Sequence, residues 1–515
     1  MDIETGNKIF LLNLFSNVLH SIINMSVMFF LTPFLTNTLG SEAFGFVGLA
    51  NNMINYLSII TVALNSVAGR FISIKIHENK INEAQVYYNS VFWMNLILAI
   101  LIALITVPVI CNIDFLIKIP KDLVVSVKLL FFFVFINYEL NIIANIFTTS
   151  TFVTNKLYLT NLGNCISGFI RVLFLLIVFS FLPIKVYYVG IASLLATIFI
   201  SIYNVVVTSK LLPFLQLNPR IFSFNVVKLL FLSGIWTSLI RLTQILSDGL
   251  DLLIGNIGIS ATAMGVLSIA YTVPNIAGIV IGSIINVFSP KQTYYFAKND
   301  MDNVIKEIKT NMKLCGFITS IIFAGIVTYG FEFYSLYVPG QNIHDIYIIT
   351  LIRLLTLLIC GVASSLDNVF LLTNHLKVNS IAWFIYSVIC VITTLVLVKF
   401  TNLGIYAIAG VSKVLSFLMY LTYVPIYASK CLNISWKSFY PQFGKYLINT
   451  FIVTVIFLLS KKILPDALSI PMFCLDIILI GILGIIYNYF LYLNKTERLV
   501  MIETCKKINK KFLRK

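Results

Sequence analysis

Apolar stretches long enough to cross a membrane recur along the whole chain. A bilayer core about 30 Å thick needs about 20 apolar residues per helix, and fourteen stretches approach or exceed that length. The pattern therefore predicts an all-α polytopic membrane protein with about fourteen transmembrane helices. The predicted spans are residues 9–35, 44–67, 91–111, 129–150, 162–182, 186–207, 229–257, 263–288, 315–337, 346–372, 381–398, 403–427, 447–460 and 470–493.

Basic residues gather in alternate connections between these stretches. With the N-terminus placed inside, most of the 36 Lys and Arg residues fall on that side, in line with the positive-inside rule. The bias predicts that both termini are cytoplasmic. We expect the basic tail, residues 494–515, to anchor to anionic lipid at the inner face, with binding to a protein partner as the alternative. The longest inner links, residues 71–90 and 291–311, predict short helices lying on that face.

The composition excludes several classes of protein. The 515 residues are 59% hydrophobic and 11% charged, with a mean hydropathy of +0.96, whereas about a quarter of the residues in soluble domains are charged. This excludes an ordinary cytosolic enzyme, a disordered protein and a nucleic-acid-binding domain, despite the net charge of +16. The 8 cysteines and 4 histidines are scattered and no GxxxxGK[ST] loop occurs. We therefore expect no metal site, no cofactor and no nucleotide-driven motor.

The chain repeats itself at an offset of 220 residues. Six spans therefore correspond to six, and because six is even, both copies cross the membrane in the same direction, as in parallel transporter repeats. The repeat predicts two six-helix bundles, residues 1–210 and 211–430, followed by two additional transmembrane helices, residues 431–493, and the basic tail. The matching residues are Lys8 with Lys228, Ala43 with Ala263, Gly45 with Gly265, Ala50 with Ala270, Asn55 with Asn275, Gly190 with Gly410 and, at 219, Thr154-Asn155 with Thr373-Asn374.

The eighth span contains a helix-breaking residue. Pro274 is followed by Gly278 and Gly282, and this combination predicts a bend. A hinge between the two bundles and a static kink are both compatible with the pattern.

Polar residues recur at helical spacing inside several spans. Residues three and four apart share a helix face, and two symmetry-related spans, the first and the seventh, each carry such a stripe. We expect the stripes to line a central hydrophilic cavity; hydrogen bonding between helices is the alternative. The stripes are Asn13, Asn17, His20 and Asn24 in the first span, Thr237, Arg241, Gln244, Asp248 and Asp251 in the seventh, and Asn51, Asn55, Ser58 and Asn65 in the second.

Seven charged residues fall within spans. Each would cost about 2.5–3.5 kcal/mol if it faced lipid at mid-membrane, so they must pair, approach an interface or line a wet cavity. Arg241 with Asp248 and Arg171 with Glu139 are candidate ion pairs, and Arg353 is expected either in the cavity or reaching the outer surface. The seven are Glu139, Arg171, Arg241, Asp248, Asp251, Arg353 and Asp367.

Two short motifs carry a family resemblance. Pro33 precedes the run Leu39-Gly40-Ser41-Glu42-Ala43-Phe44-Gly45, and Asp251-Leu252-Leu253 precedes Ser260, Gly265 and Ala270. With the repeat, these motifs resemble the multidrug/oligosaccharidyl-lipid/polysaccharide (MOP) exporter superfamily, and most closely its polysaccharide transporters and Wzx-like flippases. The resemblance implies a V-shaped bundle like that of the MATE (multidrug and toxin extrusion) transporters, in a bacterial inner membrane.

The resemblance also implies a function. It predicts a flippase, not an enzyme, that moves a polyprenyl-diphosphate-linked oligosaccharide, such as an O-antigen or capsule repeat unit, to the outer leaflet by alternating access. Arginine suits phosphate oxygens, so Arg171, Arg241 and Arg353 are candidates for the diphosphate. The polar residues Asn17, His20, Asn24, Asn55 and Gln244 are candidates for the sugar, with His20 alternatively a structural histidine. The carboxylates Glu139, Asp248 and Asp251 are candidates for binding a proton or Na⁺.

Other functions stay open from the sequence. A cation-coupled exporter of drugs or small metabolites and a lipid II flippase belong to the same superfamily. A membrane polymerase or ligase would need a substantial outer loop, and a scaffold would not explain the buried charges. Expected partners of the predicted flippase are membrane lipid, the lipid-linked oligosaccharide, a polysaccharide polymerase and glycosyltransferases.

Overall fold

The computed structural model describes residues 3–463, 470–494 and 497–498, and every regular element in these ranges is helical. It contains 14 helical segments long and apolar enough to cross a membrane, which confirms the predicted class and number of spans. The predicted basic tail, residues 494–515, lies outside the described residues except for residues 494, 497 and 498.

The segments lie along the chain in the order of the predicted spans. Seven of the segments are one helix, whereas the fourth, seventh, eighth, tenth, twelfth, thirteenth and fourteenth are each composed of more than one helical element. The elements are α1 (Ile3–Leu39), α2 (Ser41–His77), α3 (Ile81–Cys111), α4 (Ile113–Leu116), α5 (Val124–Ala144), η1 (Asn145–Thr148), α6 (Thr149–Val153), α7 (Leu157–Phe181), α8 (Tyr187–Leu211), η2 (Pro219–Ile221), α9 (Phe224–Gln244), η3 (Ile245–Gly249), α10 (Asp251–Gly258), α11 (Ala261–Ala270), α12 (Thr272–Ala297), α13 (Met301–Tyr337), α14 (Ile343–Leu355), α15 (Leu357–Ala363), η4 (Ser364–Leu366), α16 (Asp367–Leu372), α17 (Leu376–Phe400), α18 (Ile405–Leu421), α19 (Tyr423–Cys431), η5 (Trp436–Ser438), α20 (Tyr440–Ile463), α21 (Ile470–Tyr487) and η6 (Asn488–Tyr492).

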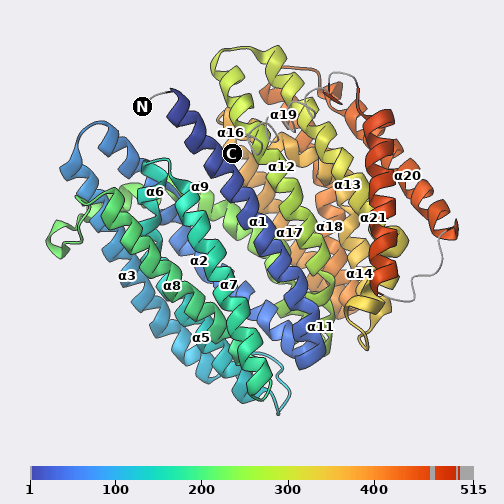
Figure 1. Ribbon diagram of the computed structural model, residues 1–515, viewed down its shortest axis with the longest axis horizontal. Coiled ribbons are helices and arrows are strands. Elements are labelled where there is room, and N and C mark those ends of the chain that lie inside the picture. The colour runs from blue at the N-terminus through green and yellow to red at the C-terminus, as the bar shows by residue number, and fades with distance from the viewer. Residues whose placement is uncertain (1–2, 464–469, 495–496, 499–515) are drawn as a thin grey trace. The chain divides into compact units, whose positions relative to one another are not determined.

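The chain divides into two compact units. Unit 1 extends to Thr272 and includes Ser380–Ile408; unit 2 comprises Val273–Asn379 and the chain from Ala409 onward. In unit 1, helix α2 is central and packs against α1, α3, α5, α9 and α11, while α3, α5 and α8 lie side by side (Figure 1). In unit 2, α13 packs against α14, α15, α20 and α21. The domain boundaries expected near residues 210 and 430 stay a prediction.

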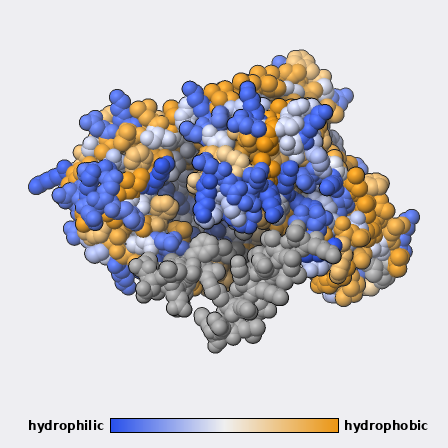
Figure 2. Space-filling view, turned by 90° about the horizontal axis from the view of Figure 1, so that it is seen from above, coloured by the Kyte–Doolittle hydropathy of each residue, from blue (hydrophilic) through white to orange (hydrophobic). Residues whose placement is uncertain are grey.

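Large apolar side chains cover much of the surface. Phe30 and Phe451 are each 70% exposed and Leu104 is 66% exposed, which is typical of surfaces that face lipid and not water. Seen from above, hydrophilic residues gather over the ends of the helices and hydrophobic residues lie along the flanks (Figure 2). The chain is therefore a multi-pass integral membrane protein.

The repeat is visible in the backbone. The turn after α2 contains Asn79 at φ 59° and the turn after α12 contains Asn299 at φ 55°, exactly one repeat later along the chain. Asn155 and Asn374, which end the fourth and tenth spans, likewise have φ of 54° and 59°. Asparagine tolerates this left-handed conformation better than most residues. Equivalent turns in the two repeats are therefore made by the same residue in the same conformation.

The predicted helices on the inner face are wrong as separate elements. Helix α2 continues to His77 and α3 starts at Ile81, so the link between them is one short turn. The same holds between α12 and α13, where the turn comprises residues 298–300. No proline or glycine interrupts residues 71–77, so the spanning helices simply continue beyond the apolar stretch.

The eighth span is interrupted near its proline. Helix α11 ends at Ala270 and α12 begins at Thr272, with a turn at Tyr271 between them. Pro274 has no N–H to donate to the carbonyl four residues earlier, that of Ala270. The predicted bend therefore corresponds to an interruption just before the proline.

A candidate anion site on helices α2 and α9

Helices α2 and α9 approach each other closely. A Cβ atom at Gly234 of α9 would lie 1.8 Å from the Ala63 carbonyl oxygen of α2, so a residue with a side chain does not fit there without a backbone shift. One turn further along, the Ser238 hydroxyl donates a hydrogen bond of 2.7 Å to the Ile59 carbonyl. This approach brings the polar residues of the seventh span against those of the second.

Arg241 is bound by uncharged side chains. Its Nε donates to the Ser58 hydroxyl at 3.1 Å and its Nη2 donates to Asn55 Oδ1 at 2.5 Å. Its Nη1 donates to Gln244 Oε1 at 3.2 Å. The structure therefore brings together three of the predicted site residues, Arg241, Asn55 and Gln244, and adds Ser58 from the same polar stripe.

No described carboxylate forms an ion pair with Arg241. The alternative ion pair with Asp248 is therefore wrong in this structure, since all three guanidinium nitrogens donate to neutral oxygens. A guanidinium group carries a positive charge in proteins. The site thus holds a positively charged guanidinium whose hydrogen-bond acceptors among the described residues are all neutral.

A second polar contact lies one turn along α2. The hydroxyls of Thr61 and Tyr138 share a hydrogen bond of 2.9 Å. Tyr138 belongs to α5, so this hydrogen bond joins α5 to α2 three residues beyond Ser58.

A π-helical turn ends the regular part of the seventh span. The Gly249 carbonyl of this turn, Ile245–Gly249, accepts hydrogen bonds from Asn52 Nδ2 at 3.1 Å and from the Tyr56 hydroxyl at 2.6 Å. Such turns occur often at functional sites. Because the turn adds a residue to the helical repeat, the prediction that one regular stripe runs from Thr237 to Asp251 is wrong beyond Gln244.

The two carboxylates of this region lie in different environments. Asp251 is 4% exposed and its Oδ2 accepts a hydrogen bond of 2.8 Å from the Tyr271 hydroxyl. Asp248 lies within the π-helical turn and is half-buried. A role of either residue in ion coupling stays a prediction.

Arg171 and Glu139 do not pair. Arg171 lies on α7 and its buried Nε has no hydrogen-bond partner among the described residues. Glu139 of α5 is half-buried, and the described residues contain no ion pair between the two. The candidate ion pair is therefore wrong, and the role of each residue alone stays a prediction.

Arg353 is buried and Asp367 is half-buried. Arg353 of α14, in unit 2, is only 6% exposed, so the alternative that it reaches the outer surface is wrong. Asp367 of α16 has one buried oxygen, and its other oxygen accepts a hydrogen bond of 3.0 Å from Tyr420.

The stripe of the first span lies on α1. Asn17 and Asn24 are exposed and His20 is half-buried. Their assignment to substrate binding stays a prediction.

The sequence pattern missed the tyrosines of the site. Tyr56, Tyr138 and Tyr271 each supply a hydroxyl to the contacts described above, but a tyrosine within a span counts as apolar in a hydropathy pattern. Each tyrosine has an asparagine three or four residues away in the chain (Asn52, Asn141 and Asn275, respectively), and this spacing is the signal that could have identified them.

Comparison with known proteins supports a transporter fold. No family model matches the chain. The membrane protein EpsK of Bacillus subtilis (strain 168) is 26% identical over 421 residues, which cover 82% of this chain and 83% of EpsK. An inward-facing multidrug resistance MATE family transporter of the MOP superfamily superposes with a TM-score of 0.63 at 14% identity, covering 81% of this chain and 96% of that structure. The lipid II flippase MurJ, in an inward closed conformation, superposes with a TM-score of 0.61 at 16% identity, covering 92% and 97%.

The chain therefore has the fold of MOP superfamily transporters and flippases. The two superposed structures are a transporter and a flippase, not enzymes. The alignment with the lipid II flippase extends over more of this chain than the alignment with the MATE transporter.

Proposed function

We propose that the protein is a flippase that moves a polyprenyl-diphosphate-linked oligosaccharide from the inner to the outer leaflet of the bacterial cytoplasmic membrane. The MOP fold supports a transporter, and the extensive superposition on a flippase named for lipid II supports a lipid-linked substrate. The repeat unit of an O-antigen, a capsule or another surface polysaccharide is the proposed cargo.

The observation that carries the proposal is the chemistry around Arg241. A diphosphate is a dianion that binds best to guanidinium groups held in place by other hydrogen bonds. Arg241 is held by Ser58, Asn55 and Gln244, and none of these cancels its charge. A site for a cationic drug would instead present a carboxylate to its substrate. Arg171 and Arg353 are further candidates for contacts with the diphosphate.

Movement of such a headgroup would be aided by the membrane potential. Each elementary charge is worth about 2.3 kcal/mol per 100 mV, so a dianion that moves outward across an inside-negative membrane gains about twice that amount. Both termini are proposed to be cytoplasmic, and alternating access would expose the headgroup first to the cytoplasm and then to the outside. Coupling to a proton or Na⁺ through Glu139, Asp248 or Asp251 is the alternative source of energy.

The proposed partners follow from the substrate. Glycosyltransferases would assemble the oligosaccharide on its lipid carrier at the inner face. A polysaccharide polymerase would consume it at the outer face. The membrane lipid would solvate the prenyl tail.

The proposal is tested in cells that lack the chromosomal copy and carry a variant on a plasmid. Arg241→Ala and Arg171→Ala are compared with the unchanged protein for surface polysaccharide per cell, at matched protein levels. We expect Arg241→Ala to reduce export at least tenfold, because an arginine bound to phosphate contributes about 1.5–3 kcal/mol. Arg241→Lys keeps the charge but not the planar fork, and an intermediate loss is expected.

The outcome separates the candidate functions. Normal export in both alanine variants, with normal protein levels, would remove the arginines from the mechanism. Normal surface polysaccharide together with increased drug sensitivity in the deletion strain would favour a drug exporter. Accumulation of lipid II in the deletion strain would favour a lipid II flippase.

A further inference from the structure

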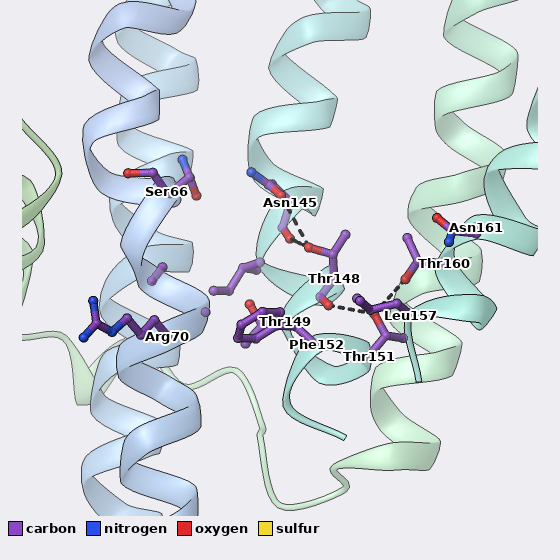
Figure 3. Close-up of a pocket in the computed structure, with 14 residues that line it drawn as sticks. Ser66, Arg70, Asn145, Thr148, Thr149, Thr151, Phe152, Leu157, Thr160 and Asn161 are labelled. Atoms are coloured by element: carbon purple, nitrogen blue, oxygen red, sulfur yellow. Dashed lines mark hydrogen bonds between the residues drawn. The ribbon is translucent and has the colours of Figure 1, made fainter. Parts of the chain in front are cut away.

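A cavity opens within unit 1, away from Arg241. It has a volume of about 300 Å³ and lies between α2, the segment α5–η1–α6, and the start of α7 (Figure 3). This volume is at the lower end of the range for ligand pockets in proteins. All the elements that line it belong to one compact unit, so the cavity is a feature of that unit alone.

Uncharged hydrogen-bonding groups line the cavity. The hydroxyls of Ser66 and Thr149 and the Nδ2 of Asn145 form no hydrogen bond with any described residue, although all three side chains line the cavity. Asn161 donates through its Nδ2 to Ser16 at 3.1 Å, which leaves its carbonyl oxygen as an acceptor. Donors and acceptors without protein partners are thus gathered at one place, and a ligand can satisfy them.

The 3₁₀ turn η1 positions the polar side chains at the cavity. Because η1 interrupts the α-helix at Asn145–Thr148, the Thr148 hydroxyl bonds back to the Asn145 carbonyl at 2.7 Å. Thr151 and Thr160 share a hydrogen bond of 2.7 Å across the gap between α6 and α7. This bond fixes the far wall of the cavity.

The charges around the cavity exclude several ligands. No carboxylate lines it, and a divalent cation would require carboxylate oxygens. Arg70 lies at the rim, and in Figure 3 its guanidinium is directed away from Asn145 and Thr148, so no cation faces the amide and hydroxyl groups as a phosphate would require. A lipid tail would leave all these polar groups without partners.

The remaining chemistry fits a sugar. Phe152 is 51% exposed and Leu157 is 39% exposed, and both line the cavity beside the hydroxyls and amides. A sugar ring has apolar C–H faces that pack on such side chains and hydroxyls that bond to Asn, Ser and Thr. Ligand sites commonly combine apolar walls with a few convergent polar groups in this way.

The cavity and Arg241 both contact helix α2, so the distance between them can be estimated along this helix. Ser58, which binds Arg241, and Asn65, which lines the cavity, are seven residues apart on the same helix. At 1.5 Å per residue the separation is about 10 Å along the helix axis. An elongated headgroup could place its diphosphate at Arg241 and its sugars at the cavity.

We propose that this cavity binds uncharged sugar residues of a glycan, through Ser66, Asn145, Thr149 and Asn161 with Phe152 as the apolar wall. The assignment to the headgroup of a lipid-linked substrate rests on the function proposed above. The ability to bind a sugar does not rest on it.

The test is a photo-crosslink in the full-length protein in its own cells. Phe152→p-benzoylphenylalanine is irradiated, and the purified protein is treated with mild acid to cleave any diphosphate and then digested for mass spectrometry. We expect the peptide around position 152 to carry a saccharide mass. Phe181→p-benzoylphenylalanine is the matched control: Phe181 lies at the end of α7 in the same unit and is 83% exposed, and it should carry no saccharide. No saccharide at position 152, or equal yields at both positions, would overturn the proposal.

A second pair of variants tests the polar groups. Thr149→Val removes the unpartnered hydroxyl but keeps the shape of the side chain. We expect about a fivefold lower yield of saccharide adduct, the effect of one lost hydrogen bond. Thr38→Val removes a hydroxyl that bonds only within its own helix and should leave the yield unchanged. An unchanged yield in Thr149→Val would contradict the assigned contacts.

The two proposals can fail separately. Loss of export in Arg241→Ala without a saccharide adduct at position 152 would leave the flippase and remove the sugar cavity. A saccharide adduct in a protein whose deletion leaves surface polysaccharide unchanged would leave the cavity and remove the flippase.

Discussion

Gly45 of α2 and Gly265 of α11 occupy equivalent positions in the two repeats and pack directly against each other. A Cβ atom at Gly45 would lie 3.0 Å from the Gly265 Cα atom. The neighbouring equivalents also meet: the Thr262 hydroxyl bonds to Glu42, and a Cβ at Gly48 would lie 2.7 Å from the Ser268 hydroxyl. Contacts between equivalent positions are typical of a two-fold relation, so α2 and α11 are related by a local two-fold axis within unit 1.

The crossing predicts a strict requirement for glycine at position 265. A Cβ there would lie 2.5 Å from the Ser41 carbonyl oxygen, so Gly265→Ala should force the helices apart and lower the stability by about 1–3 kcal/mol. Thermal unfolding in detergent measures the effect. Gly168→Ala is the control, because no atom lies within 4 Å of the added Cβ and alanine is the better helix former. Equal midpoints for Gly265→Ala and the unchanged protein would refute the close crossing.

Ser58 should act on export through Arg241. It is 8% exposed and accepts a hydrogen bond from the guanidinium Nε, so Ser58→Ala leaves that donor without its partner. A hydrogen bond to a charged group contributes about 1.5 kcal/mol, and we expect about a tenfold reduction of surface polysaccharide at matched protein levels. Ser58→Thr should restore most of it. Ser233→Ala removes a hydroxyl bonded only within its own helix and should export normally; equal export by the two alanine variants would argue against a positioning role.

We expect the ion pair between Lys313 and Glu497 to stabilise unit 2, and removal of one partner alone to cost more stability than removal of both. The two charged atoms lie 2.6 Å apart, with the side chains 7% and 18% exposed. Lys313→Met leaves a mostly buried carboxylate without its partner and should cost about 3 kcal/mol. The double variant with Glu497→Gln should recover much of this loss. Thermal unfolding of all four proteins gives the coupling energy, and purely additive effects would show that the pair makes no net contribution.

The stability contributed by Asp114 should depend on pH. Lys128 donates a hydrogen bond of 2.7 Å to the Asp114 carboxylate, and this contact lowers the pKa of Asp114 below its usual 3.8. A lowered pKa stabilises the folded state above pH 3.8, and the contribution is lost as the pH falls through the folded-state value. Asp114→Asn should therefore unfold at a slightly lower temperature than the unchanged protein at pH 7, and the difference should shrink at pH 3. A difference that stays constant between the two pH values would exclude the linkage.

Features set by spacing along one helix could be predicted from the sequence. The apolar stretches gave the number of spans, and the offset of 220 between Gly45 and Gly265 gave the repeat. The i, i+3 spacing of Arg241 and Gln244 correctly placed these two residues on one face, where they bond to each other. Which residues share a helix face depends only on their spacing along that helix, so packing against other helices does not change it.

Features set between helices could not be predicted in the same way. Whether Arg241 bonds to Asn55 and Ser58 or to Asp248 depends on how α9 lies on α2, which Gly234 determines by its contact with the Ala63 carbonyl. The π-helical turn is stabilised by Asn52 and Tyr56 of another helix, so its own residues do not specify it. The cavity arises where residues 65–70 meet residues 145–161, which lie far from them in the chain.

Because the two repeats are parts of one chain, the residues at equivalent positions on either side of the α2–α11 contact can differ. In a symmetric dimer of separate identical chains, a glutamate at position 42 would face a second glutamate, and two carboxylates would repel each other. In this chain Glu42 faces Thr262, which donates a hydrogen bond to it, and Gly48 faces Ser268 instead of another glycine. A single polypeptide can thus keep the geometry of a symmetric pair while giving each half its own chemistry.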